Sequence, residues 1–82
     1  MAKLDVKAFG VACGLVWGLA MLSLGLLNTF STWGAGIEQA MATLYIGYKP
    51  TVLGSIIGML WGFFDAGIGG LAVAWIYNKL VK

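Results

Sequence analysis

The sequence predicts an all-α membrane protein: an antiparallel hairpin of two transmembrane helices with glycine-zipper faces and a short interfacial helix in the loop. Three observations lead to this fold class. Two long apolar segments, residues 8–28 and 51–77, together contain only one charged residue. Of the 82 residues, 61% are hydrophobic and only 10% are charged, which is too little polar surface to coat a globule in water. Glycine recurs every fourth residue in both segments, a spacing that gathers glycines on one side of a helix.

The composition also excludes several classes of function. The net charge is only +2 and the lysines lie near the chain ends, so nucleic-acid binding has no support. The chain has no histidine and one cysteine, so a conventional zinc site or a histidine-based catalytic dyad cannot be assembled within one copy. We therefore expect no catalytic residues, no metal and no cofactor.

Residues 1–7 form a short polar leader, and residues 8–28 are the first predicted transmembrane helix. At about 1.5 Å per residue, a helix of this length matches the hydrocarbon core of a bilayer, which is about 30 Å thick. A basic leader before an apolar stretch also occurs in secretory signals, but this stretch is longer than the apolar region of a typical signal. We expect the segment to remain in the protein, with Cys13 as a small packing residue rather than a lipidated thiol.

Residues 29–50 are the polar connection between the two segments. Turn-forming residues come first, and a helical spacing of apolar residues follows, with Glu38, Gln39 and Thr43 away from the centre of the apolar stripe. The stripe consists of Ile37, Met41, Leu44, Tyr45 and Tyr48. Such a helix can lie in the headgroup region with its aromatic residues at the interface, or it can pack on neighbouring subunits. The sequence leaves both alternatives open.

The second predicted transmembrane helix, residues 51–77, is followed by a polar tail, residues 78–82. Pro50 is expected in the first turn of this helix, where proline is well tolerated. Most lysines flank the two termini, whereas the loop carries one lysine and one glutamate. The positive-inside rule then places both termini in the cytoplasm and the loop outside.

The two segments form an internal repeat. An offset of 44 residues superimposes four glycines and one tryptophan of the first segment on identical residues of the second, and the copies cross the membrane in opposite directions. The matched pairs are Gly10 with Gly54, Gly14 with Gly58, Trp17 with Trp61, Gly18 with Gly62 and Gly25 with Gly69.

The repeated glycines predict close helix packing, because lipid tails are as apolar as leucine and helices in a membrane associate through tight contact. In a level hairpin, residues at equal depth have numbers that sum to roughly 80, so Gly18 should meet Gly62 at the tightest crossing. Replacing either glycine with isoleucine should splay the hairpin. The larger Phe63 and Leu71 should lie on the opposite side of their helix. The predicted packing residues are Gly10, Gly14, Gly18, Gly25, Gly54, Gly58, Gly62, Gly69 and Gly70.

Asp65 is the one charged residue inside either segment. A carboxylate at the centre of a spanning helix costs about 2.5–3.5 kcal/mol on insertion scales, so a partner should satisfy it. The register places Trp17 and Trp61 nearby, and either indole N–H can donate to a carboxyl oxygen. Asp65 is then either an ion- or proton-binding group or a polar anchor between helices.

The general layout resembles the rotor-ring subunit of rotary ATPases, a hairpin with a glycine-rich first helix and a carboxylate midway along the second. This chain departs from that family in two features. Its first-helix glycines recur every fourth rather than every second residue, and its long loop lacks the Arg-Gln-Pro motif of the family.

The stretches KAFGVACGLVWGLA (7–20), WGFFDAGIGG (61–70) and WIYNKL (75–80) carry a second resemblance, which covers nearly the whole chain. With them the chain is similar to small prokaryotic two-span membrane proteins labelled "bacteriophage holin" or "membrane-associated protein". The resemblance implies a homo-oligomer of the prokaryotic inner membrane that permeabilises it, without catalytic residues.

Three hypotheses for function follow. The first is a holin-like or pore-forming protein that acts by assembly with itself in the lipid bilayer. The second is a non-catalytic structural or accessory subunit of a larger membrane complex. The third is an ion- or proton-translocating oligomer that uses Asp65.

Overall fold

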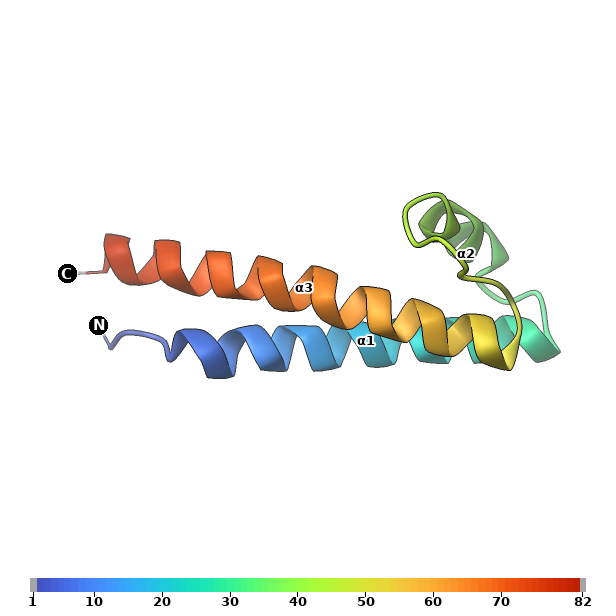
Figure 1. Cartoon of the computed structure of the whole chain (residues 1–82), viewed down its shortest axis with the longest axis horizontal. Helices are drawn as coiled ribbons and strands as arrows, with labels where there is room; N and C mark the ends of the chain where they lie inside the picture. Colours follow the sequence, from blue (N-terminus) through green and yellow to red (C-terminus); the bar gives the residue numbers. More distant parts are fainter. Residues whose placement is uncertain (1, 82) are drawn as a thin grey trace.

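The computed structural model describes residues 2–81 and confirms the all-α hairpin with a short helix in its loop. The helices are α1 (Val6–Phe30), α2 (Ala35–Ala42) and α3 (Val52–Leu80). Helices α1 and α3 run antiparallel and side by side, both termini lie at one end, and α2 rests against the flank of the hairpin near the other end (Figure 1). Met1 and Lys82, the outermost residues of the predicted leader and tail, lie outside the described residues.

Both long helices extend past the predicted apolar segments, and a side-chain cap begins each one. The Asp5 carboxylate accepts a hydrogen bond from the Ala8 amide at 3.1 Å, and the Thr51 hydroxyl accepts one from the Gly54 amide at 2.9 Å. Pro50 therefore precedes the cap of α3, and the prediction that it lies in the first helical turn was wrong. By length and composition, α1 and α3 could each cross a membrane.

The helices pack in the predicted register. A Cβ atom built on Gly62 would lie 3.3 Å from the Gly18 Cα, so these two residues are in direct contact as expected. Further along the same seam, Gly25 lies against Ser55 and Gly10 lies against Gly70. Absent side chains let the two backbones approach along most of the hairpin.

Asn78 closes the end of the hairpin that carries the termini. Its side-chain amide donates to the Leu4 carbonyl at 2.8 Å, and its side-chain oxygen accepts from the Leu4 amide at 2.7 Å. The residue belongs to the last turns of α3 rather than to a separate tail. This paired hydrogen bond fixes the segment before α1 on the end of α3.

Not all of the predicted packing glycines lie between α1 and α3. Gly54 and Gly58 instead make room for the loop, because a Cβ on Gly54 would meet the backbone of Lys49 and one on Gly58 would meet the ring of Tyr48. Gly69 is exposed, and apart from its own helical turn no atom of residues 2–81 lies within 4 Å of its Cβ position. The second copy of the repeat thus packs partly against the loop, a use that the repeat itself does not specify.

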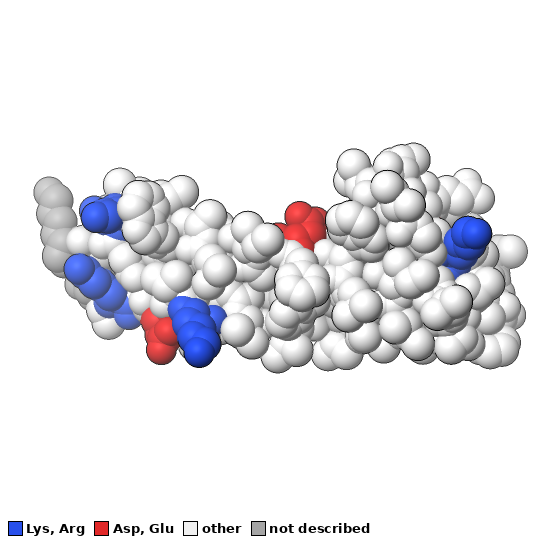
Figure 2. All heavy atoms as spheres, in the orientation of Figure 1, with Lys and Arg blue, Asp and Glu red and all other residues white. Residues whose placement is uncertain are grey.

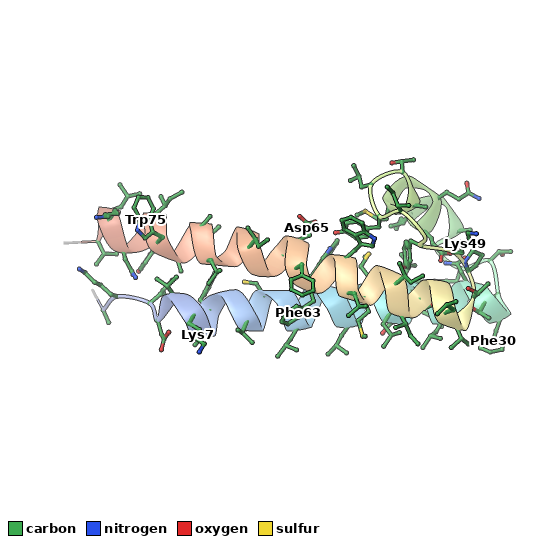
Figure 3. All side chains as sticks on the ribbon, viewed as in Figure 1. Lys7, Phe30, Lys49, Phe63, Asp65 and Trp75 are labelled. Carbon is green, nitrogen blue, oxygen red and sulfur yellow. The ribbon has the colours of Figure 1, made fainter. Side chains whose placement is uncertain are left out.

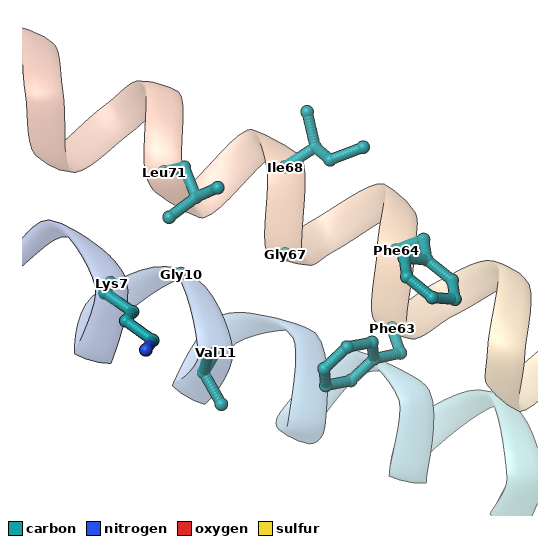
Figure 4. A pocket seen from close by; sticks show the side chains of 8 residues that line it. All are labelled: Lys7, Gly10, Val11, Phe63, Phe64, Gly67, Ile68 and Leu71. Atoms are coloured by element: carbon teal, nitrogen blue, oxygen red, sulfur yellow. The ribbon is translucent and has the colours of Figure 1, made fainter.

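Phe63 and Leu71 lie against α1 rather than away from it, which corrects the predicted orientation. The Phe63 ring lies over Gly14, and Leu71 lies over Gly10. Between them is an apolar groove of about 190 Å³, with Gly67 at its floor (Figure 4). Large side chains of α3 thus fill the space that the small residues of α1 leave open.

Candidate functional site around Asp65

Asp65 lies about halfway along the hairpin on its lateral surface. In Figure 2 an acidic patch appears there, between the lysines at the two ends of the molecule, and Figure 3 labels Asp65 at this place. More than a third of the residue is exposed, although it belongs to a helix of membrane-spanning length. Asp65 therefore lies at the surface of the hairpin and not in its core.

The carboxylate is held by Tyr45 of the loop. The Tyr45 hydroxyl donates to Asp65 Oδ2 at 2.6 Å and accepts from Trp17 Nε1 at 2.9 Å. Tyr45 thus bridges α1 and α3, with its hydroxyl acting as donor and acceptor at once. A bond of this length to a carboxylate is typical of the strong, charge-assisted class.

The predicted direct bonds from tryptophan to Asp65 were wrong. Trp17 reaches the carboxylate only through Tyr45, and the Trp61 indole donates to the Ile46 carbonyl at 2.9 Å. The Trp61 ring stacks on Tyr45, with ring centroids 6.0 Å apart and planes within 3°. Both tryptophans lie close to Asp65 as the register predicts, but their N–H groups bind the loop.

The bridging residues belong to a short stretch that we call the tyrosine segment (residues 45–48). Helix α2 ends at Ala42, and Gly47 adopts a positive φ of 93°, which turns the chain so that both tyrosines point inward. The Tyr48 hydroxyl donates to the Met21 carbonyl at 2.6 Å, and its ring lies on Gly58. Tyr45 and Tyr48 are each only 3% exposed.

This placement corrects the predicted interfacial stripe. The stripe requires one continuous helix through residue 48, but the helix stops six residues earlier, so its apolar residues separate onto two sides. Tyr45, Tyr48 and Met41 pack inward, whereas Ile37 and Leu44 remain largely exposed. The loop therefore covers the hairpin with aromatic residues and also presents an apolar outer surface.

The tyrosine segment contacts equivalent positions of the two repeats. The tryptophans at the matched positions, Trp17 and Trp61, both donate to it. Its two hydroxyls then donate to Met21 and Asp65, which are also matched at the 44-residue offset. One four-residue stretch thus ties both copies of the repeat together, and only the α3 copy contributes an ionisable group.

Sequence reasoning identified Asp65 and its tryptophan neighbours but missed the tyrosines as its partners. The available signal was the spacing Tyr-Ile-Gly-Tyr, because a glycine between two aromatic residues allows a reversal that a continuous helix forbids. Helical periodicity hid this signal, since both tyrosines also fit the apolar stripe.

Burial changes the acid–base behaviour of the tyrosine segment. Loss of hydration, with a smaller contribution from the negative charge of Glu38, raises the pKa of Tyr48 from 10.0 to about 12. Loss of hydration and the hydrogen bond to Asp65 also raise the pKa of Tyr45. Both hydroxyls therefore remain protonated donors in the folded protein at neutral pH.

We predict an alkaline loss of stability that depends on Tyr48. The unfolded chain releases the tyrosine proton near pH 10, whereas the folded protein retains it up to about pH 12, so the free energy of unfolding falls between these values. The decrease should be on the order of 1–2 kcal/mol, and Tyr48→Phe should flatten the profile in this window. Denaturant titrations in detergent from pH 8 to 12 measure it; an unchanged slope in the variant would contradict the assignment.

Within residues 2–81 there is no group of three His, Cys, Asp or Glu side chains that could hold a metal ion. Asp65 has one oxygen engaged by the Tyr45 hydroxyl. No family model, curated protein or solved structure matches the chain.

Proposed function

We propose that the chain is a small integral membrane protein of the prokaryotic inner membrane that acts by oligomeric assembly, in a holin-like or pore-forming way. Its glycine-lined seam holds each hairpin together, and its lateral surface forms the contacts between copies. Both termini face the cytoplasm and the loop faces outward, in agreement with the lysines near the termini.

The exposed side of Asp65 carries this proposal. A carboxylate that faces lipid at mid-helix is costly, and ionisable residues within membrane spans almost always face protein or a water-filled cavity. Tyr45 satisfies only one of the two oxygens, and the residue stays on the lateral surface of the single hairpin. A neighbouring copy, or water in a lumen between copies, would supply the remaining partners.

The surroundings of Asp65 agree with a protein contact. On α1, Cys13, Val16 and Trp17 line a shallow apolar depression that also includes Ala66, the residue after Asp65. Large apolar residues are exposed along both long helices, so the lateral surface suits lipid or another apolar helix. A polar group inside an apolar contact also fixes which helices pair and in which register.

The test compares wild type with Asp65→Leu after gentle extraction and after reconstitution into dye-loaded vesicles. We expect the wild type to form a discrete oligomer by native mass spectrometry and to release the dye. We expect Asp65→Leu to insert well but to assemble and release dye at least tenfold less. Asp5→Asn, which removes a carboxylate outside the spans, is the matched control and should behave as wild type. A monomeric wild type that releases no dye would refute the proposal.

Two further measurements on the extracted and reconstituted protein separate the other two hypotheses. Asp65→Asn with intact assembly but no proton or ion flux favours an ion-translocating oligomer. Stoichiometric co-purification with larger membrane proteins, without assembly of the chain alone, favours an accessory subunit.

A further inference from the structure

A second carboxylate, Glu38 of α2, is buried in a cleft at the loop end of the hairpin. Its place off the apolar stripe predicts a solvent-facing side chain, but the residue is only 4% exposed. Its Oε1 atom is buried and has no hydrogen-bond partner within residues 2–81. Leaving such a group unpaired is unfavourable, and more so when it is charged.

Glu38 lines a cleft of about 220 Å³ between the end of α1, helix α2 and the chain leading to α3. Because one water molecule takes about 30 Å³ of liquid volume, the cleft has room for a small molecule or several waters. Polar side chains contribute to its wall next to Glu38. They are Asn28, Ser31, Thr32, Gln39 and Tyr48.

Several of the fixed polar groups in this cleft are acceptors. Asn28 uses one of its two side-chain N–H groups on the Leu24 carbonyl at 3.1 Å, and its side-chain oxygen can accept. The Ser31 hydroxyl already donates to the Leu27 carbonyl at 2.8 Å. The Glu38 carboxylate can only accept when ionised. The complementary ligand is therefore a cation with several N–H donors.

Two alternatives fit the cleft less well. A divalent metal favours several carboxylate ligands at short distance, whereas among residues 2–81 Glu38 alone brings a carboxylate to the wall of the cleft. Protonation of Glu38 relieves its charge, and burial does raise the pKa of this side chain, but a neutral carboxyl group still has one carbonyl oxygen that can only accept. A primary ammonium group has three donors and one positive charge, which complement an ionised carboxylate and an amide oxygen.

We propose that the Glu38 cleft binds a primary ammonium group, with the Glu38 carboxylate as its ion partner and the Asn28 side-chain oxygen as a second acceptor. The group belongs either to a phosphatidylethanolamine headgroup or to a small free amine, which share this chemistry. This site is separate from Asp65, and its occupation does not depend on assembly between copies.

The first experiment measures thermal stability of the detergent-solubilised full chain during titration with ethanolammonium chloride. We expect a saturable rise in the melting temperature, because a ligand that binds only the folded state stabilises it. Sodium chloride and tetramethylammonium chloride at equal ionic strength should give no saturable rise, since neither offers N–H donors. Equal stabilisation by either salt would overturn the proposal, and this comparison needs no variant.

The second experiment distinguishes the source of the ammonium group. Native mass spectrometry of protein released from mixed phosphatidylethanolamine and phosphatidylglycerol nanodiscs should show one retained phosphatidylethanolamine per copy if the headgroup binds. Stabilisation by ethanolammonium without retained lipid identifies a free amine instead. Absence of both effects would mean that the cleft holds water only, and the proposal would fail.

Glu38→Gln tests the ion partner itself. The variant keeps the shape of the side chain and removes its charge, so affinity for ethanolammonium, or retention of phosphatidylethanolamine, should fall by about tenfold or more. Asp5→Asn removes an exposed carboxylate and should bind as wild type. Undiminished binding by a folded Glu38→Gln protein would overturn the assignment of Glu38.

Discussion

Replacing Gly14 with isoleucine should separate the two long helices and lower the free energy of unfolding by about 3 kcal/mol or more. A Cβ at this position would lie 2.6 Å from the Phe63 carbonyl oxygen and 3.3 Å from the Gly67 Cα. Both obstacles are backbone atoms of α3, so no change of side-chain rotamer can relieve the contact. Unfolding in mixed micelles with increasing denaturing detergent measures the loss.

Gly69→Ile is the matched control for this substitution. Gly69 lies in α3, and within the described part of the chain no other element comes within 4 Å of its Cβ position, so the same change adds a side chain without a clash. We expect it to leave the unfolding midpoint of the single hairpin nearly unchanged. If both variants unfold at the same detergent fraction, the loss does not depend on the contact between the two helices and the close-packing explanation is wrong.

Tyr45→Phe should destabilise the hairpin by about 2–3 kcal/mol, although it removes only one oxygen atom. The change leaves Trp17 Nε1 without its acceptor and Asp65 Oδ2 without its donor, so two polar groups lose a partner at once. The ring itself remains and can still stack on Trp61. Equilibrium unfolding in mixed micelles gives the magnitude, and tryptophan fluorescence reports the altered environment of Trp17.

A double-mutant cycle with Trp17→Phe separates this hydrogen-bonded chain from general packing. The two single changes break the same bond, so their losses should add to clearly more than the loss of the double variant. Tyr77→Phe is the control. Tyr77 is half-buried near the C-terminal end of α3, far from this hydrogen-bonded chain, and its substitution should have little effect. Additive losses for Tyr45 and Trp17 would show that the bond contributes nothing to stability.

The hairpin and its register were predictable from the sequence because each depends on a long, repeated signal. The two apolar segments are unambiguous. Glycines that recur every fourth residue on both helices also allow few alignments of an antiparallel pair. Contact between Gly18 and Gly62 followed from the bounds of the two segments, once their ends were set level. Such features average over many residues, so no single local interaction can reverse them.

The partners of Asp65 and the environment of Glu38 were not predictable in this way. Both depend on where a loop of about twenty residues returns along the hairpin, and this path is set by the reversal at Gly47 and the seat of Tyr48 on Gly58. Helical periodicity places residues around one helix but carries no information about which other element covers it. Gly54 and Gly58 fitted a helix-packing pattern for the same reason, although they receive the loop.

The tyrosine segment makes the two flanks of the hairpin different. It covers the flank that holds Asp65, whereas Phe63, two residues away and about 200° around the same helix, faces the flank with the apolar groove. Copies joined through like flanks form a closed pair and stop, but copies joined through unlike flanks continue around a ring or along a filament. In a ring joined through unlike flanks, every subunit contacts one neighbour with its Asp65 flank and the other neighbour with its grooved flank. The angle between the two flanks, rather than the glycine seam, would then set the number of subunits.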